Sequence, residues 1–400
     1  MKKLLMLGGA YSQIPAIKKA REMGYFVIVC DSNNKSPGQK YANQFFNIST
    51  TDKESVLKLA KSLNIDGIVC YKADSGASTV AYVAEQLDLP SNPYDSIMIL
   101  TNKDLFRRFQ KDNGFNVPRA IGYQTLDEAK ADFHNFNMPV MIKPVDSAGS
   151  LGVSKIDTHE LLEEKVSYAL AFSKVKRFII EEYIENHGPH VGGDGFSVDG
   201  KLVFRCFSNE KFSEGYSNPF LSIIASWPYI MPESIQNKIH AEIDRLLNLL
   251  NMKTCAYNFD IRIDENENVY LIEVAPRNGG DWNPNAIKYA TGVDLIEYTL
   301  KAALGEDCSD LSVVEPEGYW ATYVINSKVN GIFKGIKFHS DIKTNIVEYD
   351  LFVNPGDKIY ELNSAYEKVG IMILNFSTFE EMEEKMENIS KLIKLEIESV

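Results

Sequence analysis

The sequence predicts an α/β fold at its N-terminus and α+β structure over the rest of the chain. Residues 1–100 alternate apolar strands with amphipathic helices, residues 118–183 combine strands with a helix, and residues 257–281 show the alternating pattern of a hairpin. Strands separated by helices build parallel sheets, whereas strands joined by short polar tips pair antiparallel. A chain of 400 residues is long enough for two or three domains.

The first hundred residues predict a Rossmann-like unit. The apolar strand KKLLMLGG ends in glycines, the helix IPAIKKAREMG closes at Gly24, and a second buried strand, YFVIVCD, ends at Asp31. The same alternation continues through ESVLKLAKSLN, DGIVCY and STVAYVAEQLDLP. Helices of this length between strands imply right-handed crossovers, so we expect a parallel sheet with helices on both faces.

This unit lacks the dinucleotide-binding fingerprint. Gly8 and Gly9 follow the first strand and Asp31 ends the second, but residues 8–13 are GGAYSQ and do not have the GxGxxG spacing. An NAD-dependent oxidoreductase is therefore kept only as an alternative function.

Two further regions follow the first unit. The helix TNKDLFRRFQKDNG stops at Gly114, and residues 118–183 then contain the strand MPVMIKP, a loop, the strand GVSKI, a helix and the strand RFIIEEYI. The last ninety residues predict another α+β piece, which ends in a charged amphipathic helix over residues 378–399.

Composition excludes several classes of protein. The net charge of -13 argues against a general binder of nucleic acid or anionic membranes, because those partners require a basic surface. No apolar run is long enough to span a bilayer, and the N-terminus has no secretory signal pattern. The five cysteines are scattered without a CxxC pair, as in a cytoplasmic protein with reduced core thiols.

The stretch MIKPVDSAGSLGVSK, residues 141–155, predicts a loop between two strands. Its proline and glycines interrupt regular structure, and its small residues let backbone N–H groups approach an anion, for which phosphate is the usual case. A surface hairpin tip near Lys143 is the alternative if the loop is considered alone.

The hairpin of residues 257–281 predicts a pair of facing carboxylates. The expected register places Asp264 opposite Val269, Ile263 opposite Tyr270, Ile261 opposite Ile272, Phe259 opposite Val274, and Asp260 opposite Glu273. Two carboxylates facing across a ladder repel each other unless a cation lies between them, and oxygen ligands suit Mg²⁺. A solvated acidic hairpin is the alternative.

These parts occur in one order along the chain, together with Lys103 at a helix start. The ordered set KPVDSAGSLGV, EEYIE and IEVAPRNGG resembles the ATP-grasp ligase superfamily, whose members include biotin carboxylase, carbamoyl-phosphate synthase, D-alanine:D-alanine ligase and purine-pathway ligases. No Walker motif GxxxxGK[ST] is present. The resemblance implies a Rossmann-like pre-ATP-grasp domain (1–100), an ATP-grasp domain (101–312) with a lid subdomain (about 118–183), and a small C-terminal α+β domain (313–400).

The resemblance also assigns roles to individual residues. It implies that Arg277 stabilises the transferred phosphoryl group or the acyl phosphate, and that Asp260 and Glu273 hold Mg²⁺ or Mn²⁺. Glu181 would receive the adenine amino group. The remaining ATP contacts that it implies are Lys103 and Lys143 at the phosphates, Ser147, Gly149, Ser150 and Gly152 in the lid loop, Tyr183 and Ile184 at the base edge, and His190 at the ribose.

The sequence departs from the family pattern at two positions. Ala275 stands where many relatives have a metal-binding Asn, and we hypothesise that Asn258, opposite Ala275 in the expected register, substitutes for it. His190 stands where many relatives have a glutamate that binds the ribose, and it either performs that role or is a surface residue.

The implied reaction is ATP-dependent carboxylate–amine ligation through an acyl phosphate, with release of ADP and phosphate. Arg277 and the neighbouring glycine N–H groups could hold a carboxylate, and Asp74 or Asp281 an ammonium group, which suggests an amino-acid-like substrate. The alternatives are a purine-pathway enzyme, either a phosphoribosylglycinamide synthetase or a phosphoribosylaminoimidazole carboxylase, and a non-catalytic nucleotide-binding module. The expected partners are small molecules and a second copy of the chain in a homodimer.

Overall fold

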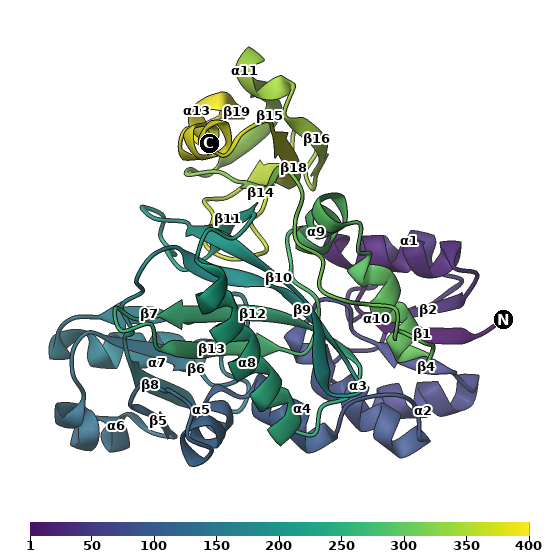
Figure 1. Cartoon of the computed structure of the whole chain (residues 1–400), viewed down its shortest axis with the longest axis horizontal. Helices are drawn as coiled ribbons and strands as arrows, with labels where there is room; N and C mark the ends of the chain where they lie inside the picture. The colour runs from purple at the N-terminus through teal and green to yellow at the C-terminus, as the bar shows by residue number, and fades with distance from the viewer. Residues whose placement is uncertain (400) are drawn as a thin grey trace.

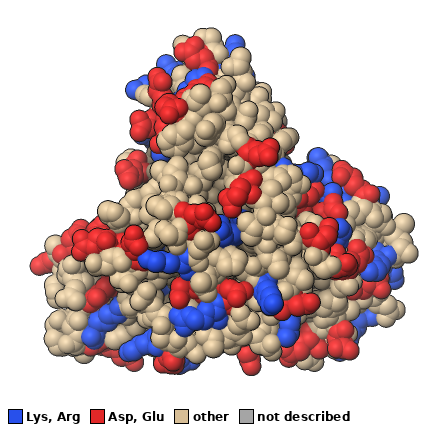
Figure 2. All heavy atoms as spheres, viewed as in Figure 1, with Lys and Arg blue, Asp and Glu red and all other residues tan. Residues whose placement is uncertain are grey.

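The computed structural model describes residues 1–399, and its three parts follow one another along the sequence (Figure 1). The N-terminal part lies to one side of a large central sheet, and the C-terminal part stands above that sheet (Figure 1). No helix among the described residues has both the length and the apolar character needed to cross a bilayer. Lys and Arg are interspersed with Asp and Glu over the face shown in Figure 2.

The N-terminal part is a four-stranded parallel sheet in the order β3-β2-β1-β4, which confirms the expected parallel sheet. Successive residues of β1 point to opposite faces, so Leu4 and Met6 pack under α1, whereas Leu5 and Leu7 pack under α2 and α3. Its elements are β1 (Lys3–Leu7), α1 (Ile14–Glu22), β2 (Phe26–Cys30), β3 (Gln44–Phe46), α2 (Lys53–Leu63), β4 (Gly67–Val69) and α3 (Asp74–Leu87).

Residues 120–182 form a small antiparallel sheet in the order β5-β8-β6-β7. Two helices, α4 and α5, precede it, and α6 and α7 pack with its strands around their own apolar core. The elements of this region are α4 (Tyr94–Thr101), α5 (Lys103–Asp112), β5 (Ala120–Tyr123), α6 (Leu126–Asp132), β6 (Val140–Pro144), β7 (Ser154–Ile156), α7 (Leu162–Phe172) and β8 (Phe178–Glu182).

The central sheet has eight strands in the order β13-β12-β9-β10-β11-β14-β18-β16, so strands of the last ninety residues continue it. Helices α9 and α10 follow the hairpin, and α10 packs back on α1. The elements are β9 (His190–Val198), β10 (Lys201–Phe212), β11 (Ser222–Trp227), α8 (Glu233–Leu249), β12 (Cys255–Ile263), β13 (Val269–Ala275), α9 (Asn283–Thr291), α10 (Leu295–Ala303), β14 (Tyr319–Ile325), β16 (Ile346–Leu351) and β18 (Gly370–Phe376).

The chain end differs from the predicted single helix over residues 378–399. The helical residues are α12 (Phe379–Glu387) and α13 (Ile389–Leu392), and β19 (Ile393–Glu398) then pairs antiparallel with β15 (Gly331–Phe338). The sequence IKLEIE alternates apolar and charged residues, and this period of two is typical of a strand with one buried face. The remaining short elements are α11 (Ser340–Lys343), β17 (Lys358–Ile359) and the 3₁₀ helices η1 (Tyr11–Gln13), η2 (Pro37–Tyr41), η3 (Phe133–Asn135) and η4 (His159–Leu161).

The hairpin register is confirmed on one side of a bulge and wrong on the other. Phe259 lies opposite Val274 and Asp260 opposite Glu273, but Ile261 lies opposite Leu271 and Ile263 opposite Val269. Because Ile272 is the extra residue of the bulge, the apolar face is completed by buried Leu271 and Val269 instead of Ile272 and Tyr270.

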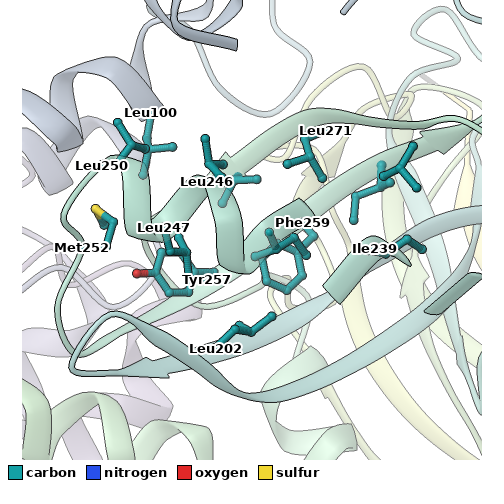
Figure 3. Packing of buried hydrophobic residues seen from close by; sticks show 14 of the residues in the cluster. Leu100, Leu202, Ile239, Leu246, Leu247, Leu250, Met252, Tyr257, Phe259 and Leu271 are labelled. Atoms are coloured by element: carbon teal, nitrogen blue, oxygen red, sulfur yellow. The ribbon is translucent and has the colours of Figure 1, made fainter. Parts of the chain in front are cut away.

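One face of the central sheet is closed by α8. Leu246 and Leu247 of this helix pack against Tyr257 and Phe259 of β12 (Figure 3). Because side chains alternate along a strand, Asn258, which stands between Tyr257 and Phe259, points to the opposite face of the sheet. That opposite face carries the polar residues described below.

We expect Leu246→Ala to lower the free energy of unfolding by about 2–5 kcal/mol, because Leu246 is fully buried and the substitution leaves a cavity under the sheet. Leu249→Ala is the matched control, since Leu249 lies on the same helix but is 47% exposed, and its change should stay within about 0.5 kcal/mol. Urea denaturation of both variants measures the difference, and equal losses would contradict this account of α8.

Candidate active site

Two carboxylates face each other at the edge of the central sheet. Asp260 on β12 pairs with Glu273 on β13, and the Lys103 ammonium lies 3.8 Å from the Glu273 carboxylate. Residues 1–399 contain no group of three or more His, Cys, Asp or Glu side chains arranged to hold a metal ion. Mg²⁺ is often bound by one or two carboxylates together with substrate phosphates, so this donor pair fits a cation shared with a nucleotide.

A buried ion triad lies beside this pair. The Glu181 carboxylate on β8 is paired with Lys143 of β6, and its second oxygen accepts a 2.9 Å hydrogen bond from Arg107 of α5. Arg107 also donates to the backbone carbonyls of Ile272 (2.9 Å) and Leu271 (3.4 Å) at the β13 bulge. Through Arg107, the strands that carry Lys143 and Glu273 therefore share one region of the molecule.

Burial alone would raise the pKa of Glu181, but Arg107 and Lys143 outweigh it and lower that pKa to about 2. Burial also lowers the pKa of Lys143, against the attraction of Glu181. Both Glu181 oxygens are thus engaged by cations, and an adenine amino group would have to share them. The contact between Glu181 and the adenine amino group therefore remains a prediction.

The glycine-rich loop (residues 145–153) joins β6 to β7. The Lys103 ammonium donates to the Ser147 carbonyl at 2.7 Å, which brings this loop to the carboxylate pair. The backbone N–H groups of residues 147–152 make no hydrogen bond with any residue in the described range. Gly149 and Gly152 have positive φ angles of 64° and 75°, so side chains there would strain the loop. A loop of unpaired N–H groups beside a lysine suits an anionic ligand.

The predicted base-edge residues are only partly free. The Tyr183 N–H donates to the Pro139 carbonyl at 3.0 Å, and the Ile184 carbonyl accepts from Arg262 at 2.5 Å. The Tyr183 carbonyl and the Ile184 N–H make no hydrogen bond with the described part of the chain. His190 begins β9, and burial lowers its pKa.

Arg277 connects the central sheet to the N-terminal part. Its guanidinium donates two hydrogen bonds to the Asp74 carboxylate, at 2.8 and 3.0 Å, and one to the Asn258 side-chain carbonyl at 2.9 Å. Asn258 lies opposite Ala275, as the expected register has it, and its amide donates to the Gly193 carbonyl at 3.0 Å. The Asn258 oxygen proposed as a metal ligand is therefore engaged by Arg277.

The RNGGDW loop (residues 277–282) follows and presents free backbone donors. The N–H groups of Gly280, Asp281 and Trp282 have no hydrogen-bond acceptor within residues 1–399, and all three residues are partly exposed. Asp281 and Trp282 both have positive φ, 55° and 60°, a strained conformation of the kind found at ligand-binding loops. The Gly279 N–H donates to buried Asp194, which fixes the start of the loop.

Sequence reasoning missed Lys72, which lies over this loop. A Cβ atom at Gly280 would lie 2.8 Å from the Lys72 ammonium nitrogen. That ammonium is 3.9 Å from the Asp281 carboxylate and makes no hydrogen bond with any described residue. Burial lowers the pKa of Lys72 to about 8. No motif could have revealed this residue, because Lys72 and Gly280 are distant in sequence.

Glu210 on β10 is a second residue that the sequence did not reveal. Its carboxylate lies over Gly192, where a Cβ atom would be 1.9 Å from Glu210 Oε1, and Gly192 pairs with Asp260. Glu210 has no Lys, Arg or His partner among residues 1–399, and burial together with Asp260 raises its pKa to about 8. By contrast, the acids expected to bind an ammonium are already paired, Asp74 with Arg277 and Asp281 with Lys368 at 2.5 Å.

Comparisons with known proteins place two regions of the chain in described families. An ATP-grasp domain profile matches residues 136–285, and a profile of the L-amino acid ligase C-terminal domain 2 matches residues 330–398. An uncharacterised protein, y4rH of Sinorhizobium fredii, is 25% identical over 338 residues, covering 82% of this chain and 68% of its own. The carbamoyl phosphate synthase large chain of Pseudothermotoga lettingae is 26% identical over 310 residues, which are 75% of this chain but only 27% of that relative.

Solved structures share the fold over the whole chain. An L-amino acid ligase from Bacillus licheniformis has a TM-score of 0.83 at 21% identity and covers 100% of this chain and 99% of its own. A phosphoribosylglycinamide synthetase from Anaerococcus prevotii has a TM-score of 0.77 at 22% identity and covers 99% of this chain and 100% of its own.

We expect the substitution Glu210→Gln to make stability less dependent on pH when the protein is kept in a metal chelator. An unfolded glutamate has a pKa of about 4.3, so raising it in the folded state gives stability that is full below that value and lost as pH rises toward 8. Glutamine cannot ionise, so the variant should gain on the natural protein between pH 5 and 8, by up to about 1.4 kcal/mol per pH unit. Urea denaturation across this range measures the gain, and parallel pH profiles would refute it.

Proposed function

This chain belongs to the ATP-grasp superfamily, and on that premise we propose that it is an ATP- and Mg²⁺-dependent carboxylate–amine ligase acting on an amino-acid-like substrate. The proposal includes an acyl phosphate intermediate and the release of ADP and phosphate. Proteins of this superfamily use ATP with Mg²⁺.

The observation that carries the proposal is the anion site at the RNGGDW loop. Three free backbone N–H groups and the Lys72 ammonium are the donors that a carboxylate needs. Arg277 begins this loop and reaches Asn258, two residues from Asp260 on the same strand. A carboxylate bound here would therefore lie near the proposed metal and phosphate residues.

We assign the nucleotide to the neighbouring loop and lysines. The free N–H groups of the glycine-rich loop and the side chains of Lys103 and Lys143 would bind the phosphates, and Asp260 and Glu273 would hold Mg²⁺. Bound there, Mg²⁺ supplies Lewis-acid stabilisation of the negative charge on the transferred phosphoryl group.

The chemistry proceeds in two steps. A substrate carboxylate oxygen attacks the γ-phosphorus of ATP, the bond to the β-phosphate oxygen breaks, and ADP leaves. A neutral amine then attacks the acyl carbonyl, the C–O bond to phosphate breaks, and the amine loses a proton as the amide forms. Arg277 lies where it would stabilise the phosphoryl oxygens in both steps, and closure of the glycine-rich loop would exclude water from the intermediate.

Glu210 supports an amino-acid-like substrate. It is a largely buried carboxyl group with no cationic partner among the described residues, on the same sheet face as the metal pair, and a bound ammonium group would favour its charged form. The match of residues 330–398 to the L-amino acid ligase C-terminal domain 2 favours the same substrate class.

A purine-pathway activity is the second candidate. The fold likeness to phosphoribosylglycinamide synthetase covers nearly the whole chain and favours it.

A homodimer is also part of the proposal, and size-exclusion chromatography with light scattering tests it.

We expect ADP release from Mg²⁺-ATP only when an amino acid and an amine are both supplied. Lys143→Ala should lower kcat/KM by about 100-fold, because the substitution removes a cation from the transferred phosphates. Lys130→Ala, an exposed lysine of the same small sheet region, should leave the rate unchanged. A screen over amino acids, bicarbonate and phosphoribosylamine measures this, and ADP release with phosphoribosylamine and glycine, but with no other amine, would favour the purine-pathway candidate.

Lys72→Met should raise the KM for the carboxylate substrate roughly tenfold or more, because a buried charge-assisted hydrogen bond is lost. The change in KM for ATP should be much smaller, since Lys72 lies at the RNGGDW loop and not at the glycine-rich loop. Lys238→Met, a half-exposed lysine on α8, is the control. Steady-state kinetics with each substrate varied in turn measures both KM values. An unchanged KM for the carboxylate substrate would show that Lys72 does not bind it.

A further inference from the structure

A segment of the C-terminal part touches both halves of the candidate site. Residues 361–368, here called the strap, connect β17 to β18. The strap is joined to the glycine-rich loop through Asn218 and bonds directly to the RNGGDW loop. The two loops are far apart in sequence, and the strap belongs to neither the central hairpin nor the small antiparallel sheet.

Asn218 makes the first connection. Its side-chain N–H donates to the Asn363 carbonyl of the strap at 2.9 Å and to the Ser150 carbonyl of the glycine-rich loop at 3.2 Å. Asn218 is only 4% exposed, and its side-chain oxygen accepts from the Phe220 N–H at 3.1 Å. One buried amide therefore joins the strap to the loop assigned to the phosphates.

Two further contacts reinforce this side. The Ser150 hydroxyl donates to the Phe220 carbonyl at 2.7 Å, and the Ser217 hydroxyl and N–H donate to the Glu361 carboxylate of the strap at 2.8 and 2.9 Å. Ser150 itself has a positive φ of 56°, so these bonds hold the loop in a conformation that a serine rarely adopts.

Lys368 makes the second connection. Its ammonium donates to the Asp281 carboxylate at 2.5 Å, and its side chain is only 10% exposed. Asp281 is one of the two consecutive positive-φ residues of the RNGGDW loop, and its N–H is one of the free donors. A largely shielded ion pair at this residue restrains the conformation of the proposed carboxylate site.

We propose that the strap couples closure of the glycine-rich loop to the geometry of the carboxylate site, with Asn218 and Lys368 as positioning residues. This inference rests on the proposed ligase function. Opening of the glycine-rich loop would break the Asn218 bonds and release the strap, and Lys368 would then hold Asp281 less firmly. Phosphoryl transfer would thus be favoured only when both loops are in place, which limits hydrolysis of ATP without ligation.

The first test measures the ADP released per amide bond formed. The natural protein should release about one ADP per amide, and Lys368→Met should raise that ratio about fivefold, with Lys368→Arg restoring it. Asn218→Asp, which keeps the oxygen acceptor but loses the N–H donor, should raise the ratio similarly. Tyr366→Ala changes a strap residue that is 86% exposed and should have no effect. Equal losses of ADP release and amide formation in Lys368→Met would overturn the proposal.

The second test does not require ligase activity. Hydrogen–deuterium exchange with and without Mg²⁺-ADP should show protection of residues 147–152 and of residues 277–282 in the natural protein. In Asn218→Asp, protection of 277–282 should be lost while protection of 147–152 persists. Protection confined to residues 147–152 in the natural protein would overturn the proposed coupling through the strap. If no acid and amine give an amide, the proposed function fails, and this exchange pattern alone still decides the inference.

Discussion

The ion pair between Arg277 and Asp74 is the interaction on which the rest of the site depends. Both groups lie between the N-terminal part and the central sheet, where an unpaired charge would be costly. The two parallel hydrogen bonds from Nε and Nη2 to Asp74 fix the plane of the guanidinium. The remaining nitrogen, Nη1, is left to donate to the Asn258 side-chain carbonyl. The pair therefore sets where the RNGGDW loop begins, and with it the direction of the free N–H groups.

The other charged groups of the site are of two kinds. Some pair with one another and hold the structure together, and others are left for a ligand. Lys143, Glu181 and Arg107 satisfy one another and hold the small sheet to the β13 bulge. Lys72 has only a distant ionic partner, Asp281 at 3.9 Å, and Glu210 has no Lys, Arg or His partner among residues 1–399. A site with fixed dipoles, a loosely paired lysine and a carboxyl group without a cation suits a ligand that carries both charges, as an amino acid does, and its donors need not reorganise during reaction.

Much of this could be predicted from the sequence where local pattern decides the structure. The alternation of strands and helices predicts the parallel sheet, and the alternation of apolar residues in the hairpin predicts the pairing of Phe259 with Val274. The bulge at Ile272 could not be predicted, because its carbonyl is satisfied by Arg107 from a distant helix. Lys72, Glu210 and Lys368 carry no motif, since their surroundings arise only from contacts between distant segments. The strand at residues 393–398 was missed because a preceding acidic helical pattern obscured its alternation.

The continuous eight-stranded sheet makes the last ninety residues part of the scaffold that bears the site. Strand β14 pairs antiparallel with β11, so these residues cover an edge whose N–H and C=O groups would otherwise meet solvent or another chain. A protein shortened near residue 312 would present that edge as a template for aggregation. Recombination with a relative at this junction would succeed only if the incoming segment supplied a strand in the same register as Ile224 with Tyr323.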